Sequence, residues 1–252
     1  MTSKDNAIYV YGFVPADVQV EDDAQGIGGA KVEVIREGEV AALVSPIKTD
    51  QAIGKPEDLQ THAELLDGTA SVAPVLPLRF GAVMTDAESV AEELLRQHHD
   101  DFAQALQQLE GHAEYVIKGR YDQKKFLSDL LDESDQARAL RDDIQAKPED
   151  ASRNSRIALG ELIAKTVEAK RQSDTQTVVG QLEDVAKQVT VRDPTHEWDA
   201  VHVALLAEVD REGDIHEFVN GLNEKGKGRV NLRLLGPLAP YDFVVAPAPA
   251  SG

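Results

Sequence analysis

The chain has 252 residues, with 26 lysine and arginine residues against 45 aspartate and glutamate residues, which gives a net charge of −19. An acidic surface of this kind repels phosphate backbones and anionic lipids, so the composition argues against nucleic-acid and membrane partners. The absence of cysteine excludes disulfides, thiolate catalysis and cysteine-ligated zinc. Because no apolar run approaches membrane-spanning length and no signal-peptide pattern opens the chain, we expect a cytoplasmic protein.

The first part of the chain predicts a small domain of three strands and one helix. Branched and aromatic residues fill Ala7–Val14, and Lys31–Ile35 and Val40–Val44 flank a Glu-Gly-Glu turn as the strands of a hairpin do. Pro56–Leu66 carries apolar residues at helical spacing, and an Asp-Gly pair follows as a stop signal. We therefore predict a β-β-β-α domain over residues 1–72.

The stretch from Ala73 to Met84 reads APVLPLRFGAVM and is a short apolar run with two prolines. We predict that Val75–Val83 is the first strand of a second domain and also the hinge from the first. Proline has no amide donor, so Pro77 must lie at an edge, a bulge or another unpaired position. Arg79 is the single charge of the run, and an ion pair with an acidic neighbour at the domain junction is favoured over ligand binding.

The following pattern predicts a modified ferredoxin-like domain over residues 73–245. A long amphipathic helix begins at Asp86 and ends at Gly111. Further elements are expected at His112–Tyr121 (strand), Asp199–Val209 (strand), Asp214–Leu222 (helix) and Val230–Leu235 (strand), with Gly236–Val245 closing the fold. Their order is βαββαβ, in which the first and third strands are central. We therefore predict an α+β fold of two domains, with His112–Tyr121 and Val230–Leu235 as the outer strands of the second.

A helical insertion over about residues 124–192 is expected to interrupt this domain. Apolar positions keep helical spacing through most of it, but Glu168–Thr175 has almost none, so we predict that this part projects into solvent. The apolar repeat does not persist over several heptads, which argues against a coiled coil. The alanine- and proline-rich end, residues 246–252, predicts a disordered tail.

No motif predicts a catalytic, cofactor or metal site. Two His-Glu pairs, at residues 196 and 216, open like the zinc motif HExxH, but alanine and asparagine stand where the second histidine should be. The glycines of Gly26–Gly29 resemble a phosphate loop, yet the acidic residues before them oppose phosphate and no complete motif is present. A turn that needs positive φ is the better interpretation of these glycines.

The uncovered face of the second sheet is expected to have an apolar centre and a charged rim, which is typical of a protein interface. Either the first domain of the chain or a separate protein occupies this face, and we favour the first domain. The candidate interaction residues are Pro77, Arg79, Val116, Leu206, Leu235, Tyr241 and Phe243.

Six short segments spread over nearly the whole chain carry a family resemblance. They are YVYG at Tyr9–Gly12, LVSPI at Leu43–Ile47, His62, PVLPLRFGAVM at Pro74–Met84, EYVIKGRYD at Glu114–Asp122 and GPLAPYDFVV at Gly236–Val245. In this order they resemble the gas vesicle protein F/L family (GvpF/GvpL). The RFG and GPxxPYxF segments are the most specific of them.

The resemblance implies an α+β protein of two domains that has no enzymatic activity and takes part in gas vesicle formation. It also implies contact with the hydrophobic shell protein GvpA and with other gas vesicle accessory proteins, and a location in the gas vesicle after a cytoplasmic stage. A shell subunit with an apolar face aggregates unless it is held, which suits an assembly factor or a minor structural component. Two other classes stay open: a ligand-binding regulatory module on a ferredoxin-like fold, and an enzyme whose site forms only in three dimensions.

Overall fold

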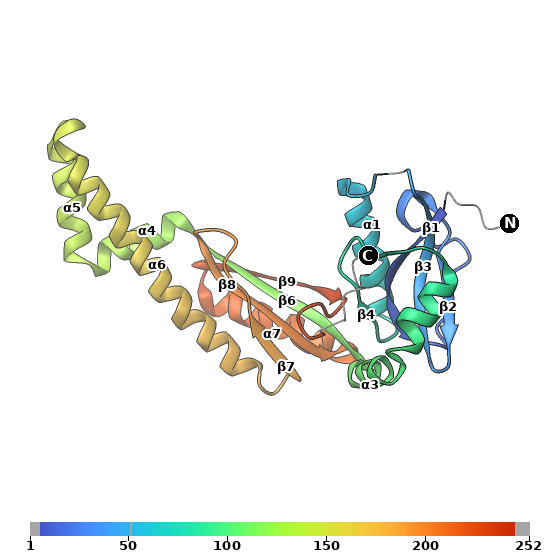
Figure 1. The fold of residues 1–252 in the computed structure, drawn as a ribbon. Coiled ribbons are helices and arrows are strands. Elements are labelled where there is room, and N and C mark those ends of the chain that lie inside the picture. Colours follow the sequence, from blue (N-terminus) through green and yellow to red (C-terminus); the bar gives the residue numbers. More distant parts are fainter. Residues whose placement is uncertain (1–5, 51, 245–252) are drawn as a thin grey trace. The chain divides into compact units, whose positions relative to one another are not determined.

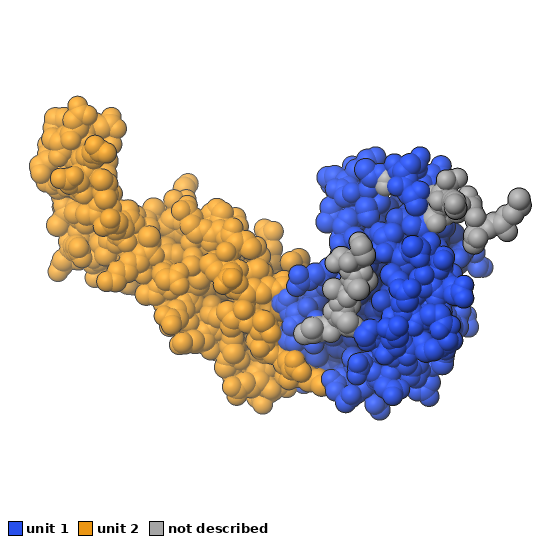
Figure 2. Space-filling model, viewed as in Figure 1, with its two compact units in different colours: residues 1–115, 206–212, 236–252 blue, residues 116–205, 213–235 orange. Residues whose placement is uncertain are grey.

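The computed structural model of the chain describes residues 6–50 and 52–244. The chain divides into two compact units (Figure 2): unit 1 comprises Met1–Tyr115, Leu206–Glu212 and Gly236–Gly252, and unit 2 comprises Val116–Leu205 and Gly213–Leu235. Three strands contribute residues to both units, so the units do not follow the predicted limits of 1–72 and 73–245. The predicted tail at 246–252 lies outside the described residues.

Most of unit 1 is formed by the first half of the chain, which is a sheet with helices (Figure 1). Its elements are β1 (Asn6–Pro15), η1 (Ile27–Gly29), β2 (Glu33–Glu37), β3 (Val40–Lys48), α1 (Pro56–Ala70), β4 (Leu76–Pro77), β5 (Val83–Met84), α2 (Ala87–Ser89), the π-helical η2 (Val90–Arg96) and α3 (His99–Leu109). The strand order is β2-β3-β1-β4, and β5 also pairs with β1. The predicted three strands and helix are confirmed.

A register shift in β1 distributes its side chains between the two faces of this sheet. β1 and β3 pair antiparallel from Asn6 opposite Lys48 to Pro15 opposite Val40, with the shift between Val10 and Gly12. Because of the shift, Val10 and Phe13 share one core with α3, where Phe13 stacks on Phe102 at 4.1 Å between ring centroids. Tyr9 and Tyr11 are both fully buried, and each contacts the ring of a histidine on α1. One strand thus serves two cores.

The apolar run after α1 belongs to this first sheet, which corrects the prediction that it opens a second one. It is not one strand: β4 pairs with β1 through Gly12–Pro77 and Phe13–Leu76, and β5 pairs with β1 through Tyr9–Val83 and Ile8–Met84. Between them the chain loops out, and Gly81 has a φ of +103°. Pro77 lies in the last strand of the order, where a missing amide donor leaves no neighbour unpaired. The edge position predicted for this proline is confirmed.

Gly12 lies where β4 closely approaches β1. A Cβ atom at this position would lie 2.6 Å from the Leu76 carbonyl oxygen and 3.2 Å from Pro77 Cα, both of which are backbone atoms. Backbone cannot rotate aside as a side chain can, so we expect Gly12→Ala to lower the free energy of unfolding by about 1–3 kcal/mol, the usual cost of overpacking. Chemical denaturation tests this, with Gly68→Ala as the control because open space surrounds Gly68. Equal stability of the two variants would contradict the prediction.

The long helix predicted between Asp86 and Gly111 is interrupted. Asp86 caps it as predicted, since its Oδ1 accepts a 2.8 Å hydrogen bond from the Ser89 amide. After α2, however, the chain adopts the π-helical segment η2, and α3 begins only at His99. Its apolar face still reaches the core, where Val90, Leu95 and Leu106 are buried.

The second half of the chain forms a four-stranded sheet with its own helices. The elements are β6 (His112–Tyr121), α4 (Gln123–Glu133), α5 (Asp135–Ala146), η3 (Asp150–Ser152), α6 (Arg153–Leu182), β7 (Gln188–Val191), β8 (Asp199–Glu208), η4 (Val209–Arg211), α7 (Glu212–Gly226) and β9 (Val230–Leu238). The strand order is β7-β8-β6-β9. β6 is therefore a central strand, although its charged residues Lys118 and Arg120 suggested an outer one, and β7 takes the outer place instead. The outer position of β9 is as predicted.

The middle of α6 contacts the chain before and at the start of β8, whereas the sequence predicted that it projects into solvent. Arg171 donates to the carbonyl oxygens of Asp199 at 2.6 Å and Glu197 at 2.7 Å, and Asp174 accepts from the Tyr121 hydroxyl at 2.7 Å. These contacts are polar, so the hydropathy pattern gave no sign of them. Within unit 2, the first half of α6 extends beyond the sheet and packs along α5 (Figure 1), where Ser155 donates to Asp143 at 2.5 Å.

Candidate functional site

Aromatic and histidine side chains from four separate parts of unit 1 meet in one place. Tyr9 and Tyr11 come from β1, His62 from α1, Phe80 from the loop after β4, and Tyr241 from the segment after β9. Ring centroids lie 4.8 Å apart for Tyr9 and Tyr11 and 5.6 Å apart for His62 and Phe80. We call these five residues the signature cluster, because each of them lies in one of the segments that carry the family resemblance.

His62 is held through both of its ring nitrogens. Its Nδ1 lies 3.0 Å from the Tyr9 hydroxyl, and its Nε2 lies 3.1 Å from the Leu78 carbonyl oxygen and 3.0 Å from the Tyr241 hydroxyl. A carbonyl oxygen only accepts, so Nε2 carries the proton and Nδ1 accepts from the Tyr9 hydroxyl. That hydroxyl in turn accepts a 3.0 Å bond from the Gly81 amide. One neutral imidazole thus links β1, α1 and the loop after β4.

Tyr11 extends the signature cluster to the glycine-rich turn before β2. Its hydroxyl lies 2.8 Å from Ser45 Oγ and accepts a 2.7 Å bond from the Ile27 amide. A Cβ atom on Gly26 would lie 2.1 Å from this hydroxyl, and Gly28 has a φ of +67°. The interpretation of these glycines as a turn with positive φ is confirmed, and the close approach to Tyr11 adds a second reason for glycine.

Burial controls the ionisation of the signature cluster. It lowers the pKa of His62, against a smaller opposing effect of the bond to Leu78. It raises the pKa of Tyr9 to about 12 and also raises the pKa of Tyr11 and Tyr241 above the ordinary value. All four groups are therefore uncharged near neutral pH. Since His62 is only 3% exposed, the arrangement suits the fastening of chain segments rather than proton exchange with a substrate.

Two carboxylates fix the segment that carries Tyr241. Asp67 accepts a 2.8 Å bond from the Ala239 amide, and the buried Glu114 accepts a 3.0 Å bond from the Asp242 amide. At the start of the same segment Gly236 has a φ of +143°, and a Cβ atom there would lie 2.5 Å from a tyrosine ring of β6. The glycine, proline, tyrosine and aspartate of the GPxxPYD pattern thus lie in a stretch whose backbone is held at several points.

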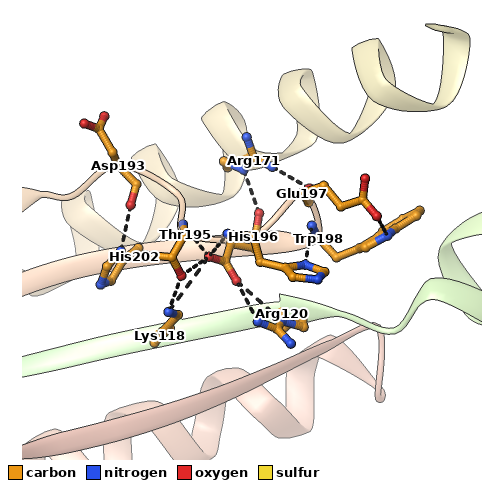
Figure 3. A network of polar contacts seen from close by, with 10 residues as sticks. Lys118, Arg120, Arg171, Asp193, Thr195, His196, Glu197, Trp198 and His202 are labelled. Atoms are coloured by element: carbon orange, nitrogen blue, oxygen red, sulfur yellow. Dashed lines mark hydrogen bonds and ion pairs between the residues drawn. The ribbon is translucent and has the colours of Figure 1, made fainter. Parts of the chain in front are cut away.

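A second polar network, in unit 2, surrounds the carboxylate of Asp199 (Figure 3). Its Oδ2 accepts from the Thr195 amide at 2.8 Å, the Thr195 hydroxyl at 3.0 Å and the His196 amide at 2.9 Å. Lys118 and Arg120 of β6 approach the two carboxylate oxygens at 4.0 Å and 3.5 Å. Burial alone would raise the pKa of Asp199, but these hydrogen bonds and the Lys118 charge hold the pKa below its ordinary value. The carboxylate is ionised at neutral pH and ties the turn before β8 to β6.

The structure does not gather the predicted interaction residues on one exposed surface. Pro77, Val116 and Leu206 are buried, and Leu206 belongs to the core of unit 1. Phe243 is partly buried against the same core. The exposed members are Arg79, Leu235, which is 50% exposed, and Tyr241, which is 37% exposed. Leu235 lies in unit 2, and the other two lie in unit 1.

Arg79 has no ion pair with any residue that the structure describes, contrary to the acidic neighbour expected for it. Across 6–50 and 52–244, no group of three or more histidine, aspartate or glutamate side chains is placed to hold a metal ion. None of the helices in these ranges has both the length and the apolar character that a membrane crossing requires.

The comparisons with known proteins agree with one another. The sequence model of the family "Gas vesicle synthesis protein GvpL/GvpF" matches residues 7–245. The chain is 27% identical to gas vesicle protein F of Dolichospermum flosaquae over 94% of its own length and 96% of that protein, and 26% identical to gas vesicle protein L of a Streptomyces species over 96% and 94%.

Solved structures give the same result. The crystal structure of GvpF from an Anabaena species superposes with a TM-score of 0.77 at 25% identity, covering 98% of this chain and all of the other. The match to the family model spans nearly the whole chain, and the signature cluster joins segments from both ends of that match. The chain belongs to the GvpL/GvpF family of gas vesicle synthesis proteins.

Proposed function

We propose that this protein is an accessory or minor structural protein of gas vesicles, which assists their assembly by binding the hydrophobic shell protein GvpA. The observation that carries the proposal is the family match over residues 7–245. Relatives that match over more than nine-tenths of this chain are named gas vesicle proteins F and L. The proposed location is the gas vesicle, after a cytoplasmic stage, and other accessory proteins are proposed as further partners.

The charge of the chain supports this role. A shell subunit that exposes an apolar face aggregates before it is incorporated. A partner with a net charge of −19 keeps the complex in solution, because like-charged complexes repel one another. The role needs neither a cofactor nor a catalytic residue.

Arg79 is the residue we propose for the contact on unit 1. It is exposed and has no ion pair with a described residue. Its two neighbours are fixed, since the Leu78 carbonyl oxygen binds His62 and the Phe80 ring packs on Tyr9. A charged side chain on a backbone that is already ordered costs less entropy to bind than one on a mobile loop. Arginine is also among the residues that most often dominate interface energies.

Co-expression with the shell protein, followed by pull-down and sedimentation, tests the proposal. We expect a recoverable complex and less shell protein in the pellet than without this chain. Arg79→Ala should weaken the complex about tenfold, the effect of a residue worth about 1.4 kcal/mol. The matched control is Arg153→Ala, which removes another exposed arginine, on α6. If no complex forms and the shell protein aggregates equally with and without the chain, the proposal is wrong.

A further inference from the structure

Unit 2 contains a cavity of about 420 Å³ that is lined by α4, α6, α7 and the sheet. This volume lies within the range of small-molecule sites in proteins, which is about 300–1,000 Å³. Its apolar wall is formed by Phe126, Val178, Val201, Leu222, Val230 and Leu232. A ligand-binding module needs a pocket of this kind between its helices and its sheet. The cavity therefore supports the ligand-binding class of function that the sequence left open.

The rim of the cavity is basic, in a chain that is strongly acidic overall. Four cations line it against two carboxylates, and both carboxylates are already engaged. Asp129 pairs with Arg229 at 3.1 Å, and Asp174 accepts from the Tyr121 hydroxyl at 2.7 Å. Lys170 lies 3.6 Å from a glutamate of α4 and over the ring of Phe126.

The other two cations, Lys225 and Lys227, have no ion pair with any residue in the described part of the chain. Two lysines that have no carboxylate partner among the described residues therefore line the cavity.

Lys227, which lines the cavity, also has an unusual backbone conformation. Its φ is +49°, and it is the one residue other than glycine with positive φ among residues 6–50 and 52–244. It follows the last residue of α7, at the left-handed position where helices usually place glycine. Glycine stands on both sides of it, at Gly226 and Gly228. A lysine in this conformation is strained relative to glycine, so the fold itself does not account for its presence.

We propose that this cavity binds an amphiphile that has one apolar chain and one anionic head, either carboxylate or phosphate. The apolar chain lies against Phe126 and the aliphatic wall, and the head lies between the Lys225 and Lys227 ammonium groups. A cationic head would be repelled by both lysines, and a purely apolar ligand would leave them unused. The inference concerns unit 2 alone and does not rest on the proposed contact with the shell protein.

Trp198 provides the signal for a direct test. It is the only tryptophan of the chain, and its ring meets the ring of Phe126 edge to face at 5.5 Å. The full chain is titrated with dodecanoate, dodecyl phosphate and dodecyltrimethylammonium, each below its critical micelle concentration. We expect a saturable change in Trp198 emission with the two anions, and affinity at least about tenfold weaker for the ammonium compound. No saturable change with either anion, or equal affinity for the cation, would overturn the proposal.

Three variants connect the signal to the cavity. The double variant Lys225→Gln/Lys227→Gln should weaken dodecanoate binding at least about tenfold, whereas Lys31→Gln/Lys48→Gln, with the same change of charge on unit 1, should leave it unchanged. Lys227→Gly should raise the melting temperature, because glycine suits positive φ, and still weaken binding. Weaker binding by a more stable protein cannot be attributed to misfolding. Unchanged affinity in both Lys227 variants would contradict the proposed site.

Discussion

Replacing His62 with alanine is expected to lower the free energy of unfolding by about 3–5 kcal/mol. Removing a buried ring leaves a cavity, which alone costs about 2–5 kcal/mol in protein cores. The substitution also removes two buried hydrogen bonds, from the Tyr9 hydroxyl to Nδ1 at 3.0 Å and from Nε2 to the Leu78 carbonyl oxygen at 3.1 Å, and this loss adds about 1–3 kcal/mol. Chemical denaturation followed by circular dichroism measures the loss.

Hydrogen exchange would identify the segments that lose stability in His62→Ala. Peptides from β1 and from the loop between β4 and β5 should lose protection, because His62 joins them. His112→Ala is the control, since this histidine lies at the start of β6 and its hydrogen bond goes to the Glu110 carbonyl oxygen, two residues away in the sequence. A loss below about 1 kcal/mol, or one no larger than that of the control, would show that the signature cluster is not a main source of stability.

The pKa of His62 adds a dependence on pH. Burial lowers its pKa in the folded chain, whereas the unfolded chain has the ordinary value of about 6.5. Below that pH the unfolded state binds more protons than the folded state, so the stabilisation by His62 is complete above about pH 6.5 and decreases as the pH falls. The stability gap between the natural chain and His62→Ala should therefore narrow from pH 7 to pH 5. A gap that stays constant would mean that His62 does not titrate differently in the two states.

The sequence predicted the elements that are set by local periodicity and missed those set by distant partners. β1, β3 and α1 carry clear apolar patterns and lie where predicted. The run from Val75 to Val83 was misplaced because its pattern shows a strand but not which strand it joins; it pairs with residues about 65–75 positions earlier. The middle of α6 was misread because Arg171 and Asp174 hold it by hydrogen bonds, to which a hydropathy pattern is blind.

In the candidate site, too, the sequence predicted local features but not the contacts between distant residues. Tyr9, His62 and Tyr241 all lie in segments that carry the family resemblance, but they are separated by 53 and 179 positions in the sequence, so their contact required the fold. Three residues of the predicted interaction surface, Pro77, Val116 and Leu206, are buried, because burial depends on which face each element covers. Asp199 is one of 45 acidic residues, and no local pattern distinguishes it from those on the surface.

Asp199→Ala is the second substitution with a large expected effect. The carboxylate accepts three hydrogen bonds at its Oδ2, and bonds to a charged acceptor contribute about 1.5–3 kcal/mol each without being additive. We therefore expect a loss of about 3–4 kcal/mol in the stability of unit 2, followed through the emission of the neighbouring Trp198. Asp199→Asn keeps the shape and one acceptor oxygen but removes the negative charge and places an amide group toward Arg120, so it should show an intermediate loss. An alanine variant as stable as the natural chain would contradict the role assigned to this network.

The effect of Asp199 on stability changes at a lower pH than that of His62. The folded-state pKa of Asp199 lies below the ordinary value near 3.8, so the unfolded chain takes up a proton first as the pH falls. The contribution of the carboxylate is therefore complete above about pH 4 and is lost as the pH falls through the folded-state pKa. The gap between the natural chain and Asp199→Asn should stay constant from pH 7 to pH 5 and narrow only below about pH 4. Narrowing already between pH 7 and pH 5 would assign the effect to another group, because a carboxylate whose pKa is lowered does not titrate in that range.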